Sequence, residues 1–315
     1  MALRIGLYLD LRNPPGWRRP WAAHYARSLE WIEEAEHRGA GSIWLSEHHF
    51  FEDGYLPQPL TFAAAVAART HRVRIGTAVY LAALRPAVQI AEEAAVVDLL
   101  SGGRLELGVG AGYRVPEFEA FGADVGTRFT TVERRLVEIG SLWKSGGVTP
   151  PPVQEPIPLW AGFFGPRGAR LAGRLGVGLL TLQPRWLGDY RAGLADGGHD
   201  PTAARVAGTL NLVLADDPDA TRAAIAPHLA YQAESYRRYA AEGAGARPPG
   251  SYPEVEVVTP DAAAARVRRL VEALPVHDIF FWMSVAGMPD DIVDRHVGHV
   301  CGLSRAFAKG EGAKR

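Results

Sequence analysis

The sequence places three ionisable residues, Glu47, His48 and His49, just after the apolar run 42–45, with only Ser46 between them. Glycines at 39 and 41 precede that run, and the pattern predicts a short buried strand with the polar residues at its C-terminal end. In a parallel α/β barrel that end carries the active site. A histidine there can exchange a proton near neutral pH. The alternative is that one histidine caps the strand while the other packs beneath a loop.

The rest of the chain predicts the barrel that would position this cluster. Helical patterns separate nearly all of eight predicted strands, at 3–9, 42–45, 73–80, 104–110, 157–162, 177–182, 206–215 and 278–283. Eight such strands in 315 residues favour a (β/α)8 TIM barrel that forms a single domain over 1–315. We expect a loop through residues 121–122 after strand four, and then a long helix at about 129–144.

A Gly- and Pro-rich stretch lies on the connection between strands seven and eight, at residues 242–260. We interpret it as an insertion on the active face. It is either a mobile lid over the site or an idle surface loop.

Composition limits the kinds of partner. The formal net charge of -1 and the pI near 6.8 lack the basic excess typical of proteins that bind nucleic acid or anionic membranes, so we expect small neutral ligands. The single cysteine, Cys301, has no partner for an internal disulfide, which suits a reducing compartment. The chain starts with a strand pattern and has no apolar run as long as a membrane span, so we expect a cytoplasmic protein.

The first glycine-rich turn carries Gly108, Gly110 and Gly112 at the end of strand four. A dinucleotide-binding fingerprint needs a helix that opens on its glycines, and Pro116 opposes a helix that continues directly from this turn. We interpret the glycines as a place where a flat ring system approaches the backbone. The alternative is an ordinary tight turn.

The second glycine-rich turn, at residues 162–168, leads into a predicted helix with proline at its first position. Free N–H groups at such a helix start, including those of Arg167 and Gly168, can bind a phosphate. Arg128, where the long helix at about 129–144 opens, could reach the same anion. The alternative for Arg128 is a surface ion pair with an acid such as Glu133.

We expect no metal site. His48 and His49 are adjacent, so on a strand their side chains point to opposite faces. His296 and His299 lie three residues apart without a third ligand, and we interpret them as part of a solvated helical face.

Several segments together resemble the bacterial luciferase-like family of flavin-dependent monooxygenases. The order and spacing of its motifs are kept over about residues 42–140, and the match is diffuse beyond residue 180. The segments that carry the resemblance are 47–50, 76–79, 85–92, 98–104, 107–110 and 117–122.

This resemblance implies a TIM barrel, usually a homodimer, that receives reduced FMN from a separate flavin reductase. Such an enzyme traps O2 as a flavin hydroperoxide and oxygenates a small organic substrate. By position, His48 matches the active-site histidine, and Ala78 with Val79 matches a non-prolyl cis peptide beneath the flavin ring. Arg128 matches a phosphate-binding arginine, and Glu117 is an acid near the flavin.

The chain departs from the family pattern at the cofactor site. Gly165 and Gly168 stand where hydroxyl side chains commonly bind the phosphate, so backbone N–H groups and Arg167 would replace them. Gly110 stands at the family's reactive cysteine, and Ala111 replaces a neighbouring arginine. These changes argue against light emission and leave oxygenation possible.

Two other functions stay open. Relatives in the same superfamily bind a deazaflavin coenzyme and transfer hydride, and others bind flavin without turnover. In the oxygenase hypothesis His48 is the acid–base group. Aromatic residues near the predicted active face suggest an apolar substrate pocket, although several could be ordinary core: Trp44, Phe50, Phe51, Tyr80, Tyr113, Phe163 and Phe164.

Overall fold

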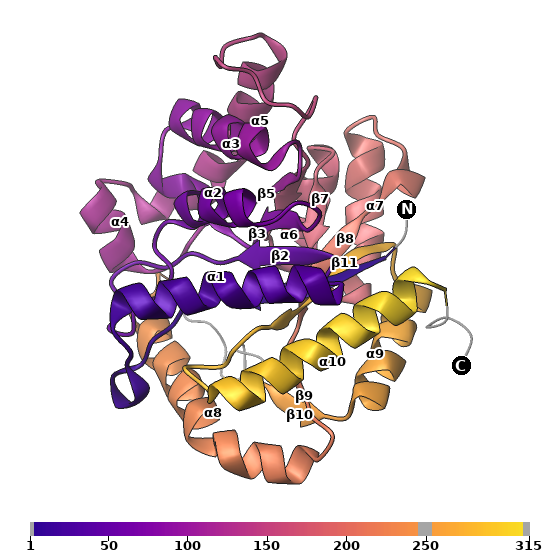
Figure 1. Cartoon of the computed structure of the whole chain (residues 1–315). Coiled ribbons are helices and arrows are strands. Elements are labelled where there is room, and N and C mark those ends of the chain that lie inside the picture. The colour runs from indigo at the N-terminus through magenta and orange to yellow at the C-terminus, as the bar shows by residue number, and fades with distance from the viewer. Residues whose placement is uncertain (1–2, 245–253, 311–315) are drawn as a thin grey trace.

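A closed parallel β-barrel forms the centre of the protein in the computed structural model, which describes residues 3–244 and 254–310 (Figure 1). The strands follow the order β3-β2-β1-β11-β8-β7-β6-β5-β4, and β3 pairs with β5 to close the barrel. The strand bounds are β1 (Arg4–Leu9), β2 (Ser42–Leu45), β3 (Arg74–Thr77), β4 (Tyr80–Leu81), β5 (Leu105–Gly110), β6 (Leu159–Ala161), β7 (Gly178–Leu180), β8 (Val206–Leu210) and β11 (Val276–Trp282). Because β4 only continues the course of β3, eight strands make the barrel, and the predicted TIM barrel is confirmed.

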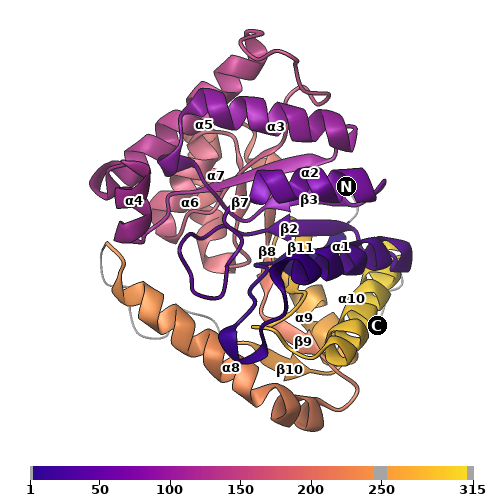
Figure 2. The same ribbon diagram turned by 60° about the vertical axis from the view of Figure 1, so that its left-hand side comes forward.

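Helices surround this barrel (Figures 1 and 2). Their bounds are α1 (Trp21–Arg38), α2 (Pro59–Arg69), α3 (Ala87–Ser101), α4 (Val115–Phe121), α5 (Arg128–Lys144), α6 (Gly165–Arg174), α7 (Leu187–Asp196), α8 (Pro218–Ala241), α9 (Pro260–Ala273) and α10 (Asp290–Ala308). Gly39 ends α1 in the left-handed conformation, with φ of 97°, where its N–H caps carbonyls of the last turn. Across the described ranges, no helix has the length and apolar character that a membrane crossing needs.

The interior of the barrel is closed at the N-terminal ends of the strands. There Arg4 pairs with Asp278 at 3.0 Å, and Arg74 pairs with Glu106 at 2.9 Å. Above this polar layer Trp44 stacks on Phe280, with ring centres 4.8 Å apart. These side chains fill the interior of the barrel, which leaves the C-terminal ends of the strands for a ligand site.

The connection between the seventh and eighth barrel strands, β8 and β11, carries extra elements. The prediction of one continuous strand at 206–215 is wrong. Its second half, β9 (Leu212–Leu214), leaves the barrel and pairs with β10 (Glu256–Val258) in a separate parallel sheet. Asn211, between β8 and β9, accepts a hydrogen bond from the Trp282 indole at 2.8 Å. Much of the predicted lid at 242–260 lies outside the described residues, so the lid stays a prediction.

Two further local predictions are wrong. The expected loop after β5 contains helix α4, because Pro116 lies in its first turn, where a missing N–H breaks no intrahelical hydrogen bond. His296 is fully buried rather than solvated, and it joins three elements. Its Nδ1 accepts the N–H of Leu214 at 2.9 Å, while its Nε2 bonds the carbonyl of Trp282 at 2.7 Å.

Candidate active site

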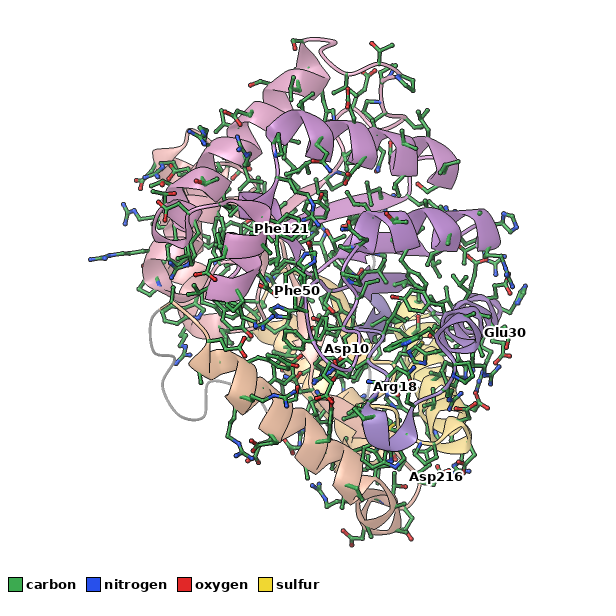
Figure 3. The ribbon with its side chains drawn as sticks, turned by 90° about the vertical axis from the view of Figure 1, so that its left-hand side faces the viewer. Asp10, Arg18, Glu30, Phe50, Phe121 and Asp216 are labelled. Atoms are coloured by element: carbon green, nitrogen blue, oxygen red, sulfur yellow. The ribbon has the colours of Figure 1, made fainter. Side chains whose placement is uncertain are left out.

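The candidate site lies where the barrel strands end, on the side of the molecule that Figure 3 faces. Asp10, Phe50 and Phe121 are labelled there, and they follow β1, follow β2 and end α4 respectively. Helix α8 runs across the same side of the barrel as α4 (Figure 2). Four separate parts of the chain therefore meet at this face.

His48 is held by a buried carboxylate. Its Nδ1 lies 3.0 Å from Oε1 of Glu117, which is 0% exposed. The same oxygen accepts the backbone N–H of His49 at 2.9 Å and lies 3.2 Å from Nη1 of Arg114. Helix α4, which sequence reasoning missed, brings Glu117 to this position.

The charge of Glu117 fixes the tautomer of His48. Burial acts to raise the pKa of Glu117, but the hydrogen bond and charge of His48 and the N–H of His49 outweigh it and lower that pKa. A charged carboxylate can only accept, so Nδ1 of His48 carries the hydrogen and Nε2 is left to take a proton. The second oxygen, Oε2, is buried with no hydrogen-bond partner in the described structure.

Glu47 and His49 have a structural role instead. Oε1 of Glu47 lies 2.8 Å from Nε2 of His49 and 2.6 Å from Nη1 of Arg85, and all three side chains are buried. Oε2 of Glu47 accepts the N–H of Leu81 at 2.7 Å. The two histidines therefore have separate partners, and the packed-histidine alternative applies to His49 alone.

The chain between β3 and β4 forms a bulge. The peptide bond between Ala78 and Val79 is cis, as the resemblance predicts, and the Tyr8 hydroxyl donates to the Ala78 carbonyl at 3.1 Å. A Cβ atom on Gly110 or on Gly162 would lie 2.4 Å from a methyl carbon of Val79. Both glycines therefore make room for Val79, and direct contact of Gly110 with a cofactor stays a prediction.

The second glycine turn opens helix α6. Gly165 has open space beyond its Cα and a φ of 79°, while a Cβ on Gly168 would lie 2.8 Å from Phe163. The N-cap residue, Phe164, has no side-chain acceptor for the first N–H groups of the helix, which include that of Arg167. An anion can occupy this helix start.

Arg128 begins α5 and is tied to backbone carbonyls. Its Nη1 donates to Val125 at 2.6 Å and its Nη2 to Ala244 at 3.1 Å, while Nε is buried without a partner among the described residues. The alternative ion pair with Glu133 is wrong, because Glu133 pairs with Arg174 at 3.0 Å. Among the described residues, Nε is therefore the one guanidinium nitrogen of Arg128 that has no partner.

Aromatic rings surround His48. Phe51 stacks on its imidazole, with ring centres 4.8 Å apart. Tyr55 and Tyr113 meet the imidazole edge-on, with ring centres 4.9 and 5.4 Å from its centre. Trp44 and Tyr80, which the sequence also suggested, are fully buried core residues. Tyr55 was missed because it lies in an irregular loop with no periodicity to mark it.

Comparisons with known proteins show which family and which fold this chain shares. The family of luciferase-like monooxygenases matches residues 4–296. The F420-dependent glucose-6-phosphate dehydrogenase of Amycolatopsis mediterranei is 29% identical over 295 residues, which cover 84% of this chain and 82% of that protein. The oxygenase component of the flavin-dependent trigonelline monooxygenase of Acinetobacter baylyi is 28% identical over 181 residues, which cover 52% of this chain and 50% of that protein. The crystal structure of monooxygenase RslO1 from Streptomyces bottropensis superposes with a TM-score of 0.79 at 22% identity and covers 96% of this chain and 98% of its own, which shows a shared fold.

Proposed function

The chain belongs to the luciferase-like monooxygenase family, and we propose that it is an FMN-dependent monooxygenase that oxygenates a small organic substrate. The observation that carries an acid–base function is the His48–Glu117 pair, set among aromatic rings at the C-terminal end of the barrel. The likeness to the oxygenase component of the trigonelline monooxygenase favours flavin-dependent oxygenation at this site. Reduced FMN, when bound, would supply the electrons that activate O2.

His48 is the acid–base residue of the proposed reaction. Glu117 keeps a hydrogen on Nδ1 of His48, so Nε2 is the atom that takes or gives the proton. The buried carboxylate of Glu117 stabilises the imidazolium ring that forms. Phe51 and Tyr113 cover the imidazole and limit the access of water to it.

The described residues fit a ring-bearing, anionic cofactor. Ala78 and Val79 would lie against the ring system, supported by Tyr8 below the bulge. The uncapped start of α6, at Gly165, Arg167 and Gly168, would bind the phosphate through backbone N–H groups. Arg128 would add its unused Nε donor, and the unpartnered Oε2 of Glu117 could accept a hydrogen bond from the ring.

A separate flavin reductase is the proposed partner. The trigonelline relative is named as an oxygenase component, which supports a two-component system. A homodimer and a cytoplasmic location stay predictions.

Anaerobic titration tests the cofactor assignment. We expect reduced FMN to bind at least tenfold more tightly than reduced F420, measured by equilibrium dialysis with each compound alone. The reverse order of affinities would contradict the FMN proposal.

The second candidate is deazaflavin-dependent hydride transfer. It is favoured by the likeness to the F420-dependent dehydrogenase, which extends over most of both chains. The His48–Glu117 pair suits this reaction equally, because a neutral imidazole can take the proton of an alcohol as its hydride leaves. Reduction of F420 by an alcohol substrate without O2 would establish it.

A further inference from the structure

Arg114 is a buried arginine that the proposed mechanism does not use. It is the N-cap residue of α4, on the turn before Glu117, and it is 2% exposed. Its Nη1 donates to the backbone carbonyl of His49 at 2.5 Å and lies 3.2 Å from Oε1 of Glu117. One guanidinium nitrogen therefore contacts both the carboxylate that holds His48 and the loop that carries His48.

The other side of the guanidinium group faces the end of helix α8. Nε of Arg114 donates to Oε2 of Glu242 at 3.1 Å, and Nη2 donates to the same oxygen. Glu242 directly follows α8, and its side chain is 37% exposed. The positive charge of Arg114 thus lies between two carboxylates, of which Glu117 is buried and Glu242 reaches solvent.

Two aromatic rings fix the guanidinium group between these acids. Its Cζ lies 4.7 Å from the ring centre of Phe51 and 4.6 Å from that of Tyr239. The two rings stack on each other with centres 3.6 Å apart, and Phe51 also stacks on His48. Arg114 and His48 therefore share Phe51 as a neighbour.

The backbone around Arg114 also holds the end of α8, which lies next to α4 in Figure 2. Two backbone hydrogen bonds, of 2.8 and 3.0 Å, and an antiparallel bridge at Arg114 join residues 113–115 to residues 242–244. A structural alternative follows from these contacts, in which Arg114 only fastens α8 to the barrel.

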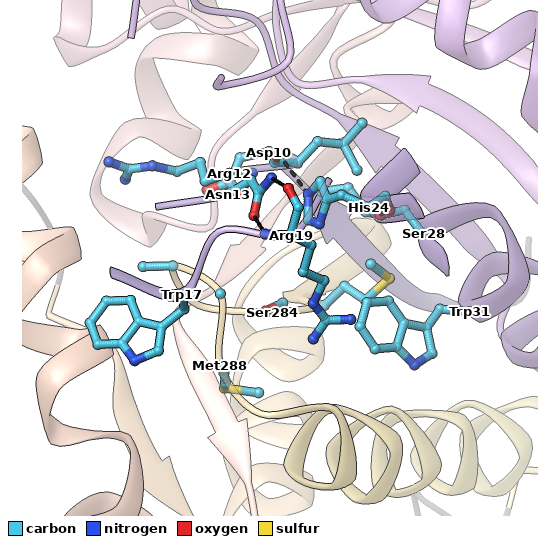
Figure 4. Close-up of a pocket in the computed structure, with 15 residues that line it drawn as sticks. Asp10, Arg12, Asn13, Trp17, Arg19, His24, Ser28, Trp31, Ser284 and Met288 are labelled. Carbon is cyan, nitrogen blue, oxygen red and sulfur yellow. Dashed lines mark hydrogen bonds between the residues drawn. The ribbon is translucent and has the colours of Figure 1, made fainter. Parts of the chain in front are cut away.

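A ligand site is the second alternative, and the donors of Arg114 argue against it. Its Nε, Nη1 and Nη2 all have carbonyl or carboxylate partners. Arg12 differs, because it lines a cavity of about 30 Å³ beside the end of β1, and its Nη1 is buried with no partner among the described residues (Figure 4). The protein itself therefore occupies the donors of Arg114.

The charge of Arg114 favours an ionised Glu117. A buried carboxyl group prefers its neutral form unless a cation or hydrogen-bond donors stabilise the anion. His48 carries a charge only when it holds a second proton, whereas a guanidinium group is always charged. Of the three described groups that contact Oε1 of Glu117, Arg114 is therefore the one with a permanent charge. A neutral Glu117 would donate to Nδ1 of His48, and the hydrogen of the neutral ring would then lie on Nε2.

We propose that Arg114 is a positioning residue, which keeps Glu117 ionised and directed at Nδ1 of His48 so that Nε2 stays free for the proton. The inference rests on the proposed acid–base function of His48. When Nε2 takes a proton, the imidazolium ring and Arg114 together balance the carboxylates of Glu117 and Glu242. Arg114 acts on the reaction only through Glu117 and the loop.

Nitrogen NMR of the cofactor-free protein with isotopically labelled histidines reads the tautomer directly, at a pH where the ring of His48 is neutral. The signals of His48 are those that His48→Gln lacks. We expect the hydrogen on Nδ1 in the wild type and on Nε2 in most molecules of Arg114→Gln, because neutral Glu117 then donates to Nδ1. Arg114→Lys keeps a charge beside Glu117 and should restore the wild-type tautomer.

Glu242→Gln separates this role from the fastening of α8. Glu242→Gln and Arg114→Gln both break the ion pair with the end of α8, but only Arg114→Gln removes the charge beside Glu117. We therefore expect Glu242→Gln to keep the hydrogen on Nδ1. The wild-type tautomer in Arg114→Gln, or the same change of tautomer in both variants, would overturn the proposal.

Arg238→Gln is the matched control, since half-exposed Arg238 lies over the same Tyr239 ring at 4.7 Å and should leave the tautomer unchanged when replaced. If Arg114→Gln does not fold, the double variant Arg114→Gln/Glu242→Gln takes its place, because it leaves no carboxylate at residue 242 without its partner. The wild-type tautomer in the double variant would equally overturn the proposal. The FMN assignment fails by a different measurement, the titration with reduced cofactors, so the two failures are distinguishable.

Discussion

The His48–Glu117 pair is the central feature at the scale of single residues. One buried carboxylate oxygen lies within hydrogen-bond distance of His48, of the N–H of His49 and of Arg114. This arrangement holds one tautomer of His48 without using its Nε2. The neighbouring Glu47 and His49 stabilise the loop instead, so adjacent residues of the same types do different work.

Glu117→Gln should lower turnover by about 10²-fold or more while the protein stays folded, because the amide no longer stabilises a charged His48. The matched control is Glu119→Gln, at an exposed position of the same helix. Steady-state kinetics measure both variants. Equal turnover of the two variants would contradict the assigned role of Glu117.

Arg128→Ala should weaken the binding of FMN about tenfold or more and leave the binding of riboflavin nearly unchanged, because only FMN carries the phosphate. Arg134→Ala, at an exposed position of the same helix, is the control. Fluorescence titration gives both affinities. Equal losses for the two ligands would count against a phosphate site at Arg128.

At the scale of elements, the bulge between β3 and β4 depends on two glycines that accommodate Val79. Gly110→Ala should lower the free energy of unfolding by about 1–3 kcal/mol, because its Cβ would overlap Val79. Gly140→Ala, on α5 with open space around it, should raise that free energy by up to about 1 kcal/mol. Urea denaturation measures both, and a neutral Gly110→Ala would show that the bulge adapts.

His296 makes the packing of α10 on β9 and β11 sensitive to pH. Burial lowers its pKa to about 4, so the unfolded chain binds a proton more readily than the folded protein between pH 6.5 and 4. The free energy of unfolding should therefore fall as the pH is lowered from 6.5 to 4. The loss from this group is about 3 kcal/mol at most. His296→Gln should reduce this fall, and His299→Gln on the same helix should keep it. Identical pH slopes for His296→Gln and the wild type would contradict the assignment.

The sequence predicted elements whose signals are local. Alternating apolar patterns located the barrel strands, and the polar cluster after 42–45 located His48 at a strand end. Helix α4 was missed because Pro116 was interpreted only as a helix breaker, although proline is tolerated in a first turn. The split of strand 206–215 was missed because both halves are apolar, and only tertiary pairing separates β9 from β8.

At the scale of the whole molecule, the barrel and its long β8–β11 connection together make the site. The barrel ends position His48 and the Val79 bulge. Ser235 of α8 accepts a hydrogen bond from Arg12, and Glu242, which follows α8, pairs with Arg114. These long-range contacts leave no periodic signal, so the roles of Arg12, Tyr55 and Arg114 could not be predicted from sequence. Family resemblance predicted the cis peptide and marked Glu117 as an acid near the flavin, whereas the contact of Glu117 with His48 came only from the structure.

The reaction of the reduced complex with oxygen tests the central claim most directly. The protein is loaded with reduced FMN without oxygen, mixed with O2 in a stopped-flow spectrometer, and followed in the near-ultraviolet range. The account predicts a transient species distinct from oxidised FMN, whose lifetime shortens when His48 is replaced by alanine. Direct formation of oxidised FMN without such a species, at the rate of free reduced FMN, would contradict the monooxygenase assignment.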